Sequence, residues 1–176
     1  MGAEKIVFAA LALALLAGLA FVAAESAPKQ PVAFFAYGTN LAKSAMNARA
    51  GGFLNATKAG ICGYGLVFAS QDARPAEFGV ATAIQNNSGC VEGALYYLTQ
   101  GQMAALDRQS GVPGFYERRA VKAALPGGSA VDAQAYFLAG SVHRQAPSRP
   151  YYLAAQGGME EWGYGAAALK NAAAAD

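Results

Sequence analysis

Two short segments of the 176-residue chain combine residue types that could bind a small molecule and react with it. The first is Tyr37-Gly38-Thr39-Asn40-Leu41, where an apolar stretch meets a glycine and then polar residues that could begin a helix. Backbone N–H groups at a helix start point outward at the positive end of the dipole, so this turn could bind a carboxylate or a phosphate. An ordinary strand-to-helix turn has the same pattern, and the motif alone favours that simpler interpretation. The spacing of a P-loop is absent.

The second segment runs from Leu106 to Tyr116 and brings an acid, a serine, glycines and an aromatic hydroxyl to an expected helix-to-strand junction. Loops between regular elements often carry functional residues. Asp107 by itself fits a solvated position on a helix. Tyr116, Tyr136 and Tyr151 could line a pocket, although tyrosine is also common at the edge of a core.

The composition of the chain excludes several classes of function. Lysine and arginine number 13 against 11 aspartate and glutamate, and this balance argues against the clustered basic surface of a nucleic-acid-binding protein. One histidine and two cysteines cannot supply a four-ligand structural zinc site of the usual spacing. Hydrophobic residues make up 55% of the chain and charged residues 14%, which excludes intrinsic disorder.

Much of the apolar excess lies in one uncharged run at the front of the chain, residues 6–24. Lys5 precedes the run, and Val22 and Ala24 have the −3/−1 spacing of a signal-peptide cleavage site. We therefore expect a secretory signal peptide. An uncleaved membrane anchor is one alternative, because the run is just long enough to cross a bilayer. A buried core helix is the other.

Export would place the protein outside the cytosol, either secreted or periplasmic, or anchored at a membrane through the apolar run. Cys62 and Cys90 could then form one disulfide. Two buried free thiols in neighbouring strands fit the sequence equally well. The expected divisions are a signal peptide or anchor, a linker and one folded domain, at residues 1–24, 25–31 and 32–176.

Hydrophobic patterning places a strand-rich middle between helical segments, which predicts an α+β fold with a small, mixed, curled sheet. Strands are expected at residues 31–37, 60–69, 79–84, 91–98, 115–125 and 130–138, the last two as an antiparallel pair. A turn is expected at residues 86–89. Helices are expected at 41–50, after Thr99 with a capping box to Gln102, from Ser148 through Gln156, and at 165–174.

A series of short motifs in this order resembles the gamma-glutamylcyclotransferase-like family. Tyr37-Gly38-Thr39-Asn40-Leu41, followed by Met46 and Arg49, is similar to the YGSNL…M..R opening of that family. The resemblance covers residues 32–165. Further matching segments, in the family's order, are residues 63–68, 79–84, 91–96, 106–118 and 147–151, with Gly158 after them.

The resemblance implies a small mixed β-barrel flanked by helices, with a pocket that holds the carboxylate of a γ-glutamyl group. In the family's reaction, the α-amine of the glutamyl group attacks its own γ-carbonyl and releases 5-oxoproline and an amine. Such a reaction needs orientation and proton transfer, so no metal or cofactor is expected. The expected partner is a small γ-glutamyl compound, without nucleic acid, and with a membrane only through the N-terminal segment. The implied substrate-binding residues are Tyr37, Gly38, Thr39, Asn40, Leu41 and Tyr116.

The chain departs from the family at the catalytic position. The family pattern is LDxxEG, with Glu as the general acid and base, whereas this chain has Leu106-Asp107-Arg108-Gln109-Ser110-Gly111. Ser110 therefore occupies the place of the catalytic glutamate. Loss of such a group typically slows a reaction by about 100- to 10,000-fold, so we expect impaired or altered catalysis.

Three explanations of Ser110 stay open, and with them whether the protein is an enzyme. Another carboxylate, such as Asp107 or Glu117, could reach the pocket. The protein could instead bind γ-glutamyl or related amides without turnover. Ser110 could also act as a nucleophile with His143 as its base, although the sequence lacks a nucleophile-elbow motif.

Overall fold

The apolar stretch after Pro31 forms β1 (Val32–Ala36) in the computed structural model, which describes residues 30–174. This strand pairs on one edge with β3 in the antiparallel sense and on the other with β5 in the parallel sense. Phe34 and Phe35 are both almost fully buried. A strand that is paired on both edges and covered on both faces has no polar side, which explains its uninterrupted apolar sequence.

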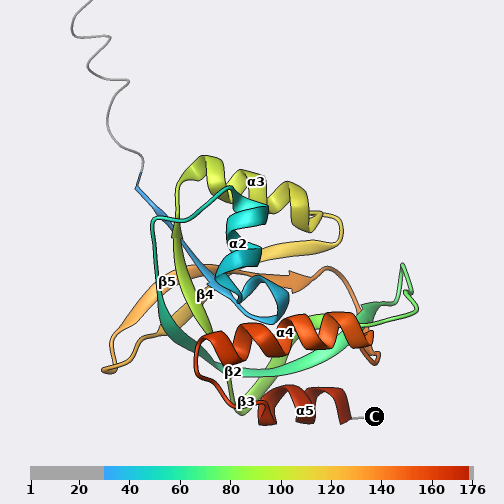
Figure 1. The fold of residues 1–176 in the computed structure, drawn as a ribbon. Helices are drawn as coiled ribbons and strands as arrows, with labels where there is room; N and C mark the ends of the chain where they lie inside the picture. The colour runs from blue at the N-terminus through green and yellow to red at the C-terminus, as the bar shows by residue number, and fades with distance from the viewer. Residues whose placement is uncertain (1–29, 175–176) are drawn as a thin grey trace, which may run out of the picture. The chain divides into compact units, whose positions relative to one another are not determined.

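Six strands form one sheet in the order β3-β1-β5-β4-β2-β6, and an additional pairing of β3 with β2 closes it into a barrel (Figure 1). β4 and β5 form the expected antiparallel pair. The predicted fold class, a small mixed barrel flanked by helices, is confirmed. The other strands are β2 (Asn55–Gln71), β3 (Val80–Leu98), β4 (Tyr116–Ala124), β5 (Ala130–Leu138) and β6 (Val142–Arg144).

Two strands are longer than the sequence pattern indicated. β2 has 17 residues and β3 has 19, so β3 joins two segments that we expected to be separate strands. Residues 86–89 do not end the strand as predicted. They bulge out opposite Gly63, where the register between the two strands shifts and where the glycine has a φ of +83°. A local turn signal is therefore accommodated inside a continuous strand, which is the usual effect of a β-bulge.

A disulfide joins the two strands beside this bulge. Cys62 of β2 and Cys90 of β3 lie directly opposite each other in the antiparallel register, and their Cα atoms are 4.0 Å apart. Both residues are exposed. Of the two possibilities that the sequence left open, the structure contains the disulfide and not the buried free thiols.

The helices lie outside the barrel, α2 beside α3 and α4 beside α5 (Figure 1). The predicted capping box is confirmed, because the Thr99 side chain accepts from the Gln102 N–H and Thr99 N–H donates to the Gln102 side chain. None of the helices in residues 30–174 is long and apolar enough to cross a membrane, and the predicted leader at residues 6–24 lies outside the described part. Their bounds are η1 (Gly38–Asn40), α2 (Lys43–Ala50), α3 (Gln100–Ser110), α4 (Arg149–Glu161) and α5 (Ala167–Ala174).

The loop after β1 is held in place by the core behind it. Leu41 is fully buried, and its carbonyl accepts hydrogen bonds from the Tyr96 hydroxyl at 2.7 Å and from the Trp162 indole N–H at 2.8 Å. Gly158 brings α4 against the same loop, since a Cβ there would lie 3.1 Å from the nitrogen of Ala42. Two long-range hydrogen bonds and one close helix contact therefore set the position of the loop.

Candidate active site

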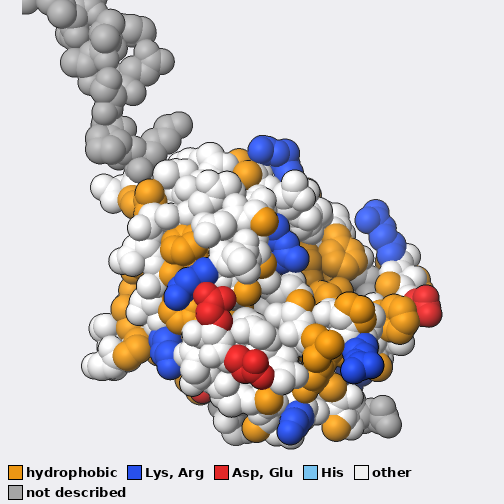
Figure 2. Space-filling model, viewed as in Figure 1, with side chains coloured by type: hydrophobic (Ala, Val, Ile, Leu, Met, Phe, Trp, Pro, Cys, Tyr) orange, Lys and Arg blue, Asp and Glu red, His pale blue; other side chains and the backbone are white. Residues whose placement is uncertain are grey.

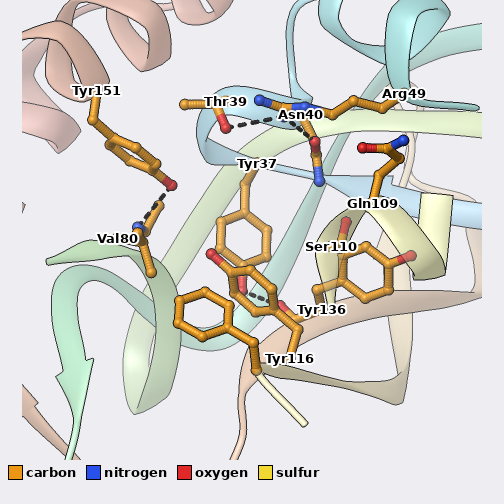
Figure 3. A pocket seen from close by; sticks show the side chains of 12 residues that line it. Tyr37, Thr39, Asn40, Arg49, Val80, Gln109, Ser110, Tyr116, Tyr136 and Tyr151 are labelled. Carbon is orange, nitrogen blue, oxygen red and sulfur yellow. Dashed lines mark hydrogen bonds between the residues drawn. The ribbon is translucent and has the colours of Figure 1, made fainter. Parts of the chain in front are cut away.

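A pocket of about 220 Å³ opens where the C-terminal end of β1 meets the end of α3 and the start of β4 (Figure 3). Both segments that the sequence analysis singled out contribute to it, although they lie some seventy residues apart in the chain. Ser110 and four of the six expected binding residues lie on its wall. The lining residues are Tyr37, Thr39, Asn40, Arg49, Val80, Ala81, Gln109, Ser110, Phe115, Tyr116, Tyr136 and Tyr151.

The two other expected binding residues, Gly38 and Leu41, shape the loop and do not line the pocket. Gly38 has a φ of +66°, and a Cβ there would lie 2.7 Å from the Cβ of Ala81. Only glycine allows the chain to turn this tightly against β3. Leu41 is buried in the core. Both residues thus act on the pocket by fixing the backbone of Thr39 and Asn40 between them.

Arg49 is the charged side chain among the described residues that line the pocket. Its Nη1 donates to Thr39 Oγ1 at 3.1 Å and also to Asn40 Oδ1, so α2 and the loop share one edge of the cavity (Figure 3). Neither partner is charged, and no ion pair of Arg49 occurs within residues 30–174. The guanidinium therefore keeps its positive charge available to an anionic ligand.

Four tyrosines form much of the remaining wall. Burial raises the pKa of Tyr37, Tyr116, Tyr136 and Tyr151 above the ordinary tyrosine value, so their hydroxyls stay protonated at neutral pH. The Tyr37 hydroxyl donates to the Tyr136 carbonyl, and the Tyr151 hydroxyl accepts from the Ala81 N–H at 3.0 Å. The three tyrosines suggested by the sequence as pocket residues, at positions 116, 136 and 151, all line the cavity.

Ser110 ends α3 and lies on the pocket wall near Tyr136 (Figure 3). Gly111 follows with a φ of +69°, the left-handed conformation that commonly ends a helix. Within residues 30–174, no carboxylate lines the pocket. The site thus contains one cation and several hydroxyl and amide groups, and it lacks the acidic side chain that general acid and base catalysis would use.

The two carboxylates considered as substitutes lie behind or beside this wall. Asp107 accepts a hydrogen bond from the Tyr136 hydroxyl at 2.8 Å, and its other oxygen lies 3.5 Å from Arg118 Nη2. Glu117 pairs with Arg119, two residues further along β4, and is partly exposed. Asp107 therefore contacts the pocket through a lining residue, whereas Glu117 does not.

The arrangement of a serine nucleophile with a histidine base is not formed. His143 lies on β6, where its Nδ1 is 2.7 Å from Asp72 Oδ1, and both side chains are about half exposed. It is not among the lining residues. The structure thus brings Ser110 together with tyrosines and not with His143.

Five lining residues were not expected to bind a ligand. Signals for three of them existed in the sequence, because Arg49 belongs to the motif that carries the resemblance, and Gln109 and Phe115 lie in the second segment. The other two come from the start of β3 and have no local signal, because their place depends on long-range pairing and on the turn at residue 38. These two are Val80 and Ala81.

The closed mixed barrel, with helices outside it and one cation among the described residues that line its pocket, defines the fold class of the chain. Within this class, the family model for gamma-glutamyl cyclotransferase, AIG2-like, matches residues 34–156. The chain belongs to this family, and the resemblance stated from its motifs is confirmed.

Solved structures support the same fold. A structure described as a gamma-glutamyl cyclotransferase superposes with a TM-score of 0.71 at 23% identity, covering 84% of this chain and 89% of its own. An uncharacterized protein, loc79017 from Homo sapiens, gives the same four values. A gamma-glutamyl cyclotransferase specific to glutathione from yeast has a TM-score of 0.57 at 12% identity, covering 82% and 96%. No curated protein matched the chain.

Proposed function

We propose that the pocket binds a small γ-glutamyl amine or peptide and that its conversion to 5-oxoproline is impaired or altered. The observation that carries this proposal is the composition of the pocket wall. It holds Arg49 and Ser110 but no carboxylate among the described residues. Membership of the family is the reason to propose this type of reaction. The serine at position 110 is the reason to expect that the reaction is impaired or altered.

The binding half of the proposal rests on charge and size. A γ-glutamyl group carries an α-carboxylate, which the Arg49 guanidinium would attract and hold. At about 220 Å³ the cavity is smaller than the roughly 300–1,000 Å³ of common ligand sites, which suits a compact polar compound.

The catalytic half rests on proton transfer. The α-ammonium must lose a proton before its nitrogen can attack the γ-carbonyl carbon. The leaving nitrogen must gain a proton as the amide C–N bond breaks. The Tyr151 hydroxyl accepts from the Ala81 N–H and can donate its own proton to the oxygen of the tetrahedral intermediate, but burial raises its pKa, so it stays protonated and is a poor base. Turnover without a carboxylate is therefore expected to be slow.

The test compares 5-oxoproline release from a γ-glutamyl dipeptide by the native protein, Ser110→Glu and Ser110→Gln. Glutamate should raise turnover by about 100-fold or more because it restores a general acid and base. Glutamine has nearly the same size without the carboxylate and should leave the rate low. Native turnover equal to that of Ser110→Glu would contradict the proposal.

Binding without turnover is the second candidate function, and the same absence of a carboxylate favours it. Calorimetric titration with the γ-glutamyl dipeptide should then show saturable binding by the native protein while no 5-oxoproline forms. Absence of binding heat across several γ-glutamyl ligands would count against both candidates.

We also propose that the protein is exported or tethered to a membrane through residues 6–24. The exposed disulfide between Cys62 and Cys90 supports an oxidising compartment, because such bonds persist there and are rare in the cytosol. Mass spectrometry of protein recovered from each cell fraction tests this location and also shows whether the leader is removed. Recovery of the full-length chain in the cytosol alone would contradict it.

A further inference from the structure

The Tyr136 phenol connects the pocket to the carboxylate of Asp107. Tyr136 lies on the pocket wall, and its hydroxyl donates to Asp107 Oδ1 at 2.8 Å. Tyr136 is 4% exposed, and the Asp107 side chain is 18% exposed. Arg118 lies 3.5 Å from the other oxygen of Asp107 and offsets part of its charge. A partly buried carboxylate thus lies one hydrogen bond behind the wall.

The direction of this hydrogen bond determines what the phenol offers to the pocket. Because the Tyr136 proton points to Asp107, the lone pairs of its oxygen remain for a donor on the pocket side. Ser110 is a candidate for such a donor, since it lies on the same pocket wall near Tyr136 (Figure 3). Asp107 and Ser110 lie three residues apart on one face of α3. Asp107 therefore contacts the phenol, and Ser110 lies beside it.

The ring of Tyr136 is held in a fixed orientation. It stacks on Tyr116 with ring centroids 5.9 Å apart and packs on Phe34 at 4.7 Å. Of the four tyrosines on the wall, Tyr136 is the one that hydrogen-bonds to a carboxylate within residues 30–174. Fixed geometry of this kind is what proton transfer to a bound ligand requires.

We propose that Tyr136 is a catalytic residue that carries protons between the γ-glutamyl ligand and Asp107, and that Asp107 acts through it as a positioning residue and proton store. This proposal rests on the proposed function. It assigns the residual turnover to a hydroxyl–carboxylate pair in place of the missing glutamate. Where the ligand nitrogen lies nearer to Ser110 than to Tyr136, the serine hydroxyl can carry the proton between that nitrogen and the Tyr136 oxygen.

The proton path is balanced. An α-ammonium proton passes to the Tyr136 oxygen while the phenolic proton passes to Asp107 Oδ1. The freed amine forms a C–N bond with the γ-carbonyl carbon and closes the ring. The stored proton returns along the same path to the leaving nitrogen as the amide C–N bond breaks, which regenerates the Asp107 carboxylate. The ring nitrogen then gives its second proton through the same path to the released amine, which leaves as an ammonium ion, and the lactam nitrogen of 5-oxoproline keeps one hydrogen. No oxidant, reductant or co-reactant is consumed.

The first test measures kcat for 5-oxoproline release by the native protein, Tyr136→Phe and Asp107→Asn. Each substitution keeps the shape of its side chain and removes one member of the path. We expect kcat to fall by about 100-fold or more, with the calorimetric Kd for the γ-glutamyl dipeptide unchanged. Asp132→Asn is the matched control, because Asp132 forms an exposed ion pair with Lys122 between β5 and β4 and does not line the pocket; this variant should leave kcat unchanged.

The second test separates proton transfer from a structural role. In the Ser110→Glu background the new carboxylate serves the ligand directly, so Asp107→Asn should then have little effect on kcat. An equal fold-loss in both backgrounds would overturn the proposal, because a structural contact is needed in each.

Failure of this proposal can be told apart from failure of the proposed function. If the native protein binds the ligand and only Ser110→Glu turns it over, the Tyr136 path alone is overturned. The same holds if the native protein binds and turns over the ligand and Asp107→Asn does not change its kcat. Absence of both binding and turnover in the native protein and in Ser110→Glu would overturn the proposed function and the path together.

Discussion

The guanidinium of Arg49 donates to the hydroxyl of Thr39 across the gap between α2 and the loop after β1. This contact ties the cation to the edge of the pocket without neutralising it, because the partner is uncharged. The pocket is thus prepared for an anionic group before any ligand arrives (Figure 3).

Replacing Arg49 with methionine should weaken γ-glutamyl binding. Hydrogen bonds to a charged group contribute about 1.5–3 kcal/mol, so the calorimetric Kd should rise by about 10- to 150-fold. Arg49→Lys should recover part of the loss, because lysine keeps the charge but not the two-pronged geometry. Lys122→Met, at an exposed position away from the pocket, is the control. An unchanged Kd in Arg49→Met would show that the ligand carboxylate binds elsewhere.

Two adjacent glycines of α4 should respond to alanine with opposite signs. At Gly158 a Cβ would meet the nitrogen of Ala42 at 3.1 Å and the Cβ of Leu41 at 3.2 Å, so Gly158→Ala should destabilise by about 1–3 kcal/mol. At Gly157 nothing lies within 4 Å, and Gly157→Ala should stabilise the helix by about 0.5–1 kcal/mol. Urea unfolding measures both. Equal effects would mean that α4 does not pack closely on the loop.

Removing the disulfide should lower the free energy of unfolding. The bond closes a loop between residues 28 positions apart, and the double variant Cys62→Ser, Cys90→Ser should lose about 3 kcal/mol. Because the disulfide lies on the exposed surface beside the bulge, γ-glutamyl binding should be retained at temperatures well below the lowered Tm. Unfolding curves that coincide with and without reductant would contradict the first expectation.

Stability should fall at alkaline pH. Burial raises the pKa of Tyr37, Tyr116, Tyr136 and Tyr151 above the usual value of 10.0. The folded protein therefore binds more protons than the unfolded chain above pH 10, and the free energy of unfolding should be constant near neutrality and decrease as pH rises beyond 10. Urea unfolding between pH 7 and 11 measures this, with phenolate absorbance followed in parallel. Ionisation of all nine tyrosines with an ordinary midpoint near pH 10 would contradict it.

The sequence predicted most regular elements but misjudged how far three of them, β2, β3 and α4, extend. The capping box at Thr99 and the start of α4 at Ser148 were correct, because a cap depends on residues within one helical turn. The turn signal at residues 86–89 was overruled by the pairing of β2 with β3, which continues on both sides of the bulge. Short β6 was missed, since three residues carry too little pattern to indicate a strand.

The candidate site also combines features that the sequence predicts with features that depend on the tertiary structure. The motifs by themselves determined the family, the two segments that form the pocket and the presence of serine at position 110, because each is a matter of residue type and order. Only the tertiary structure decided that Arg49 reaches the loop, that Gly38 and Leu41 lie behind the wall, and that His143 lies apart. These depend on barrel closure and helix packing, which bring together residues that no local spacing relates. The contact of Asp107 with Tyr136 is of this second kind, and it joins a helix to a strand across 29 positions of the chain.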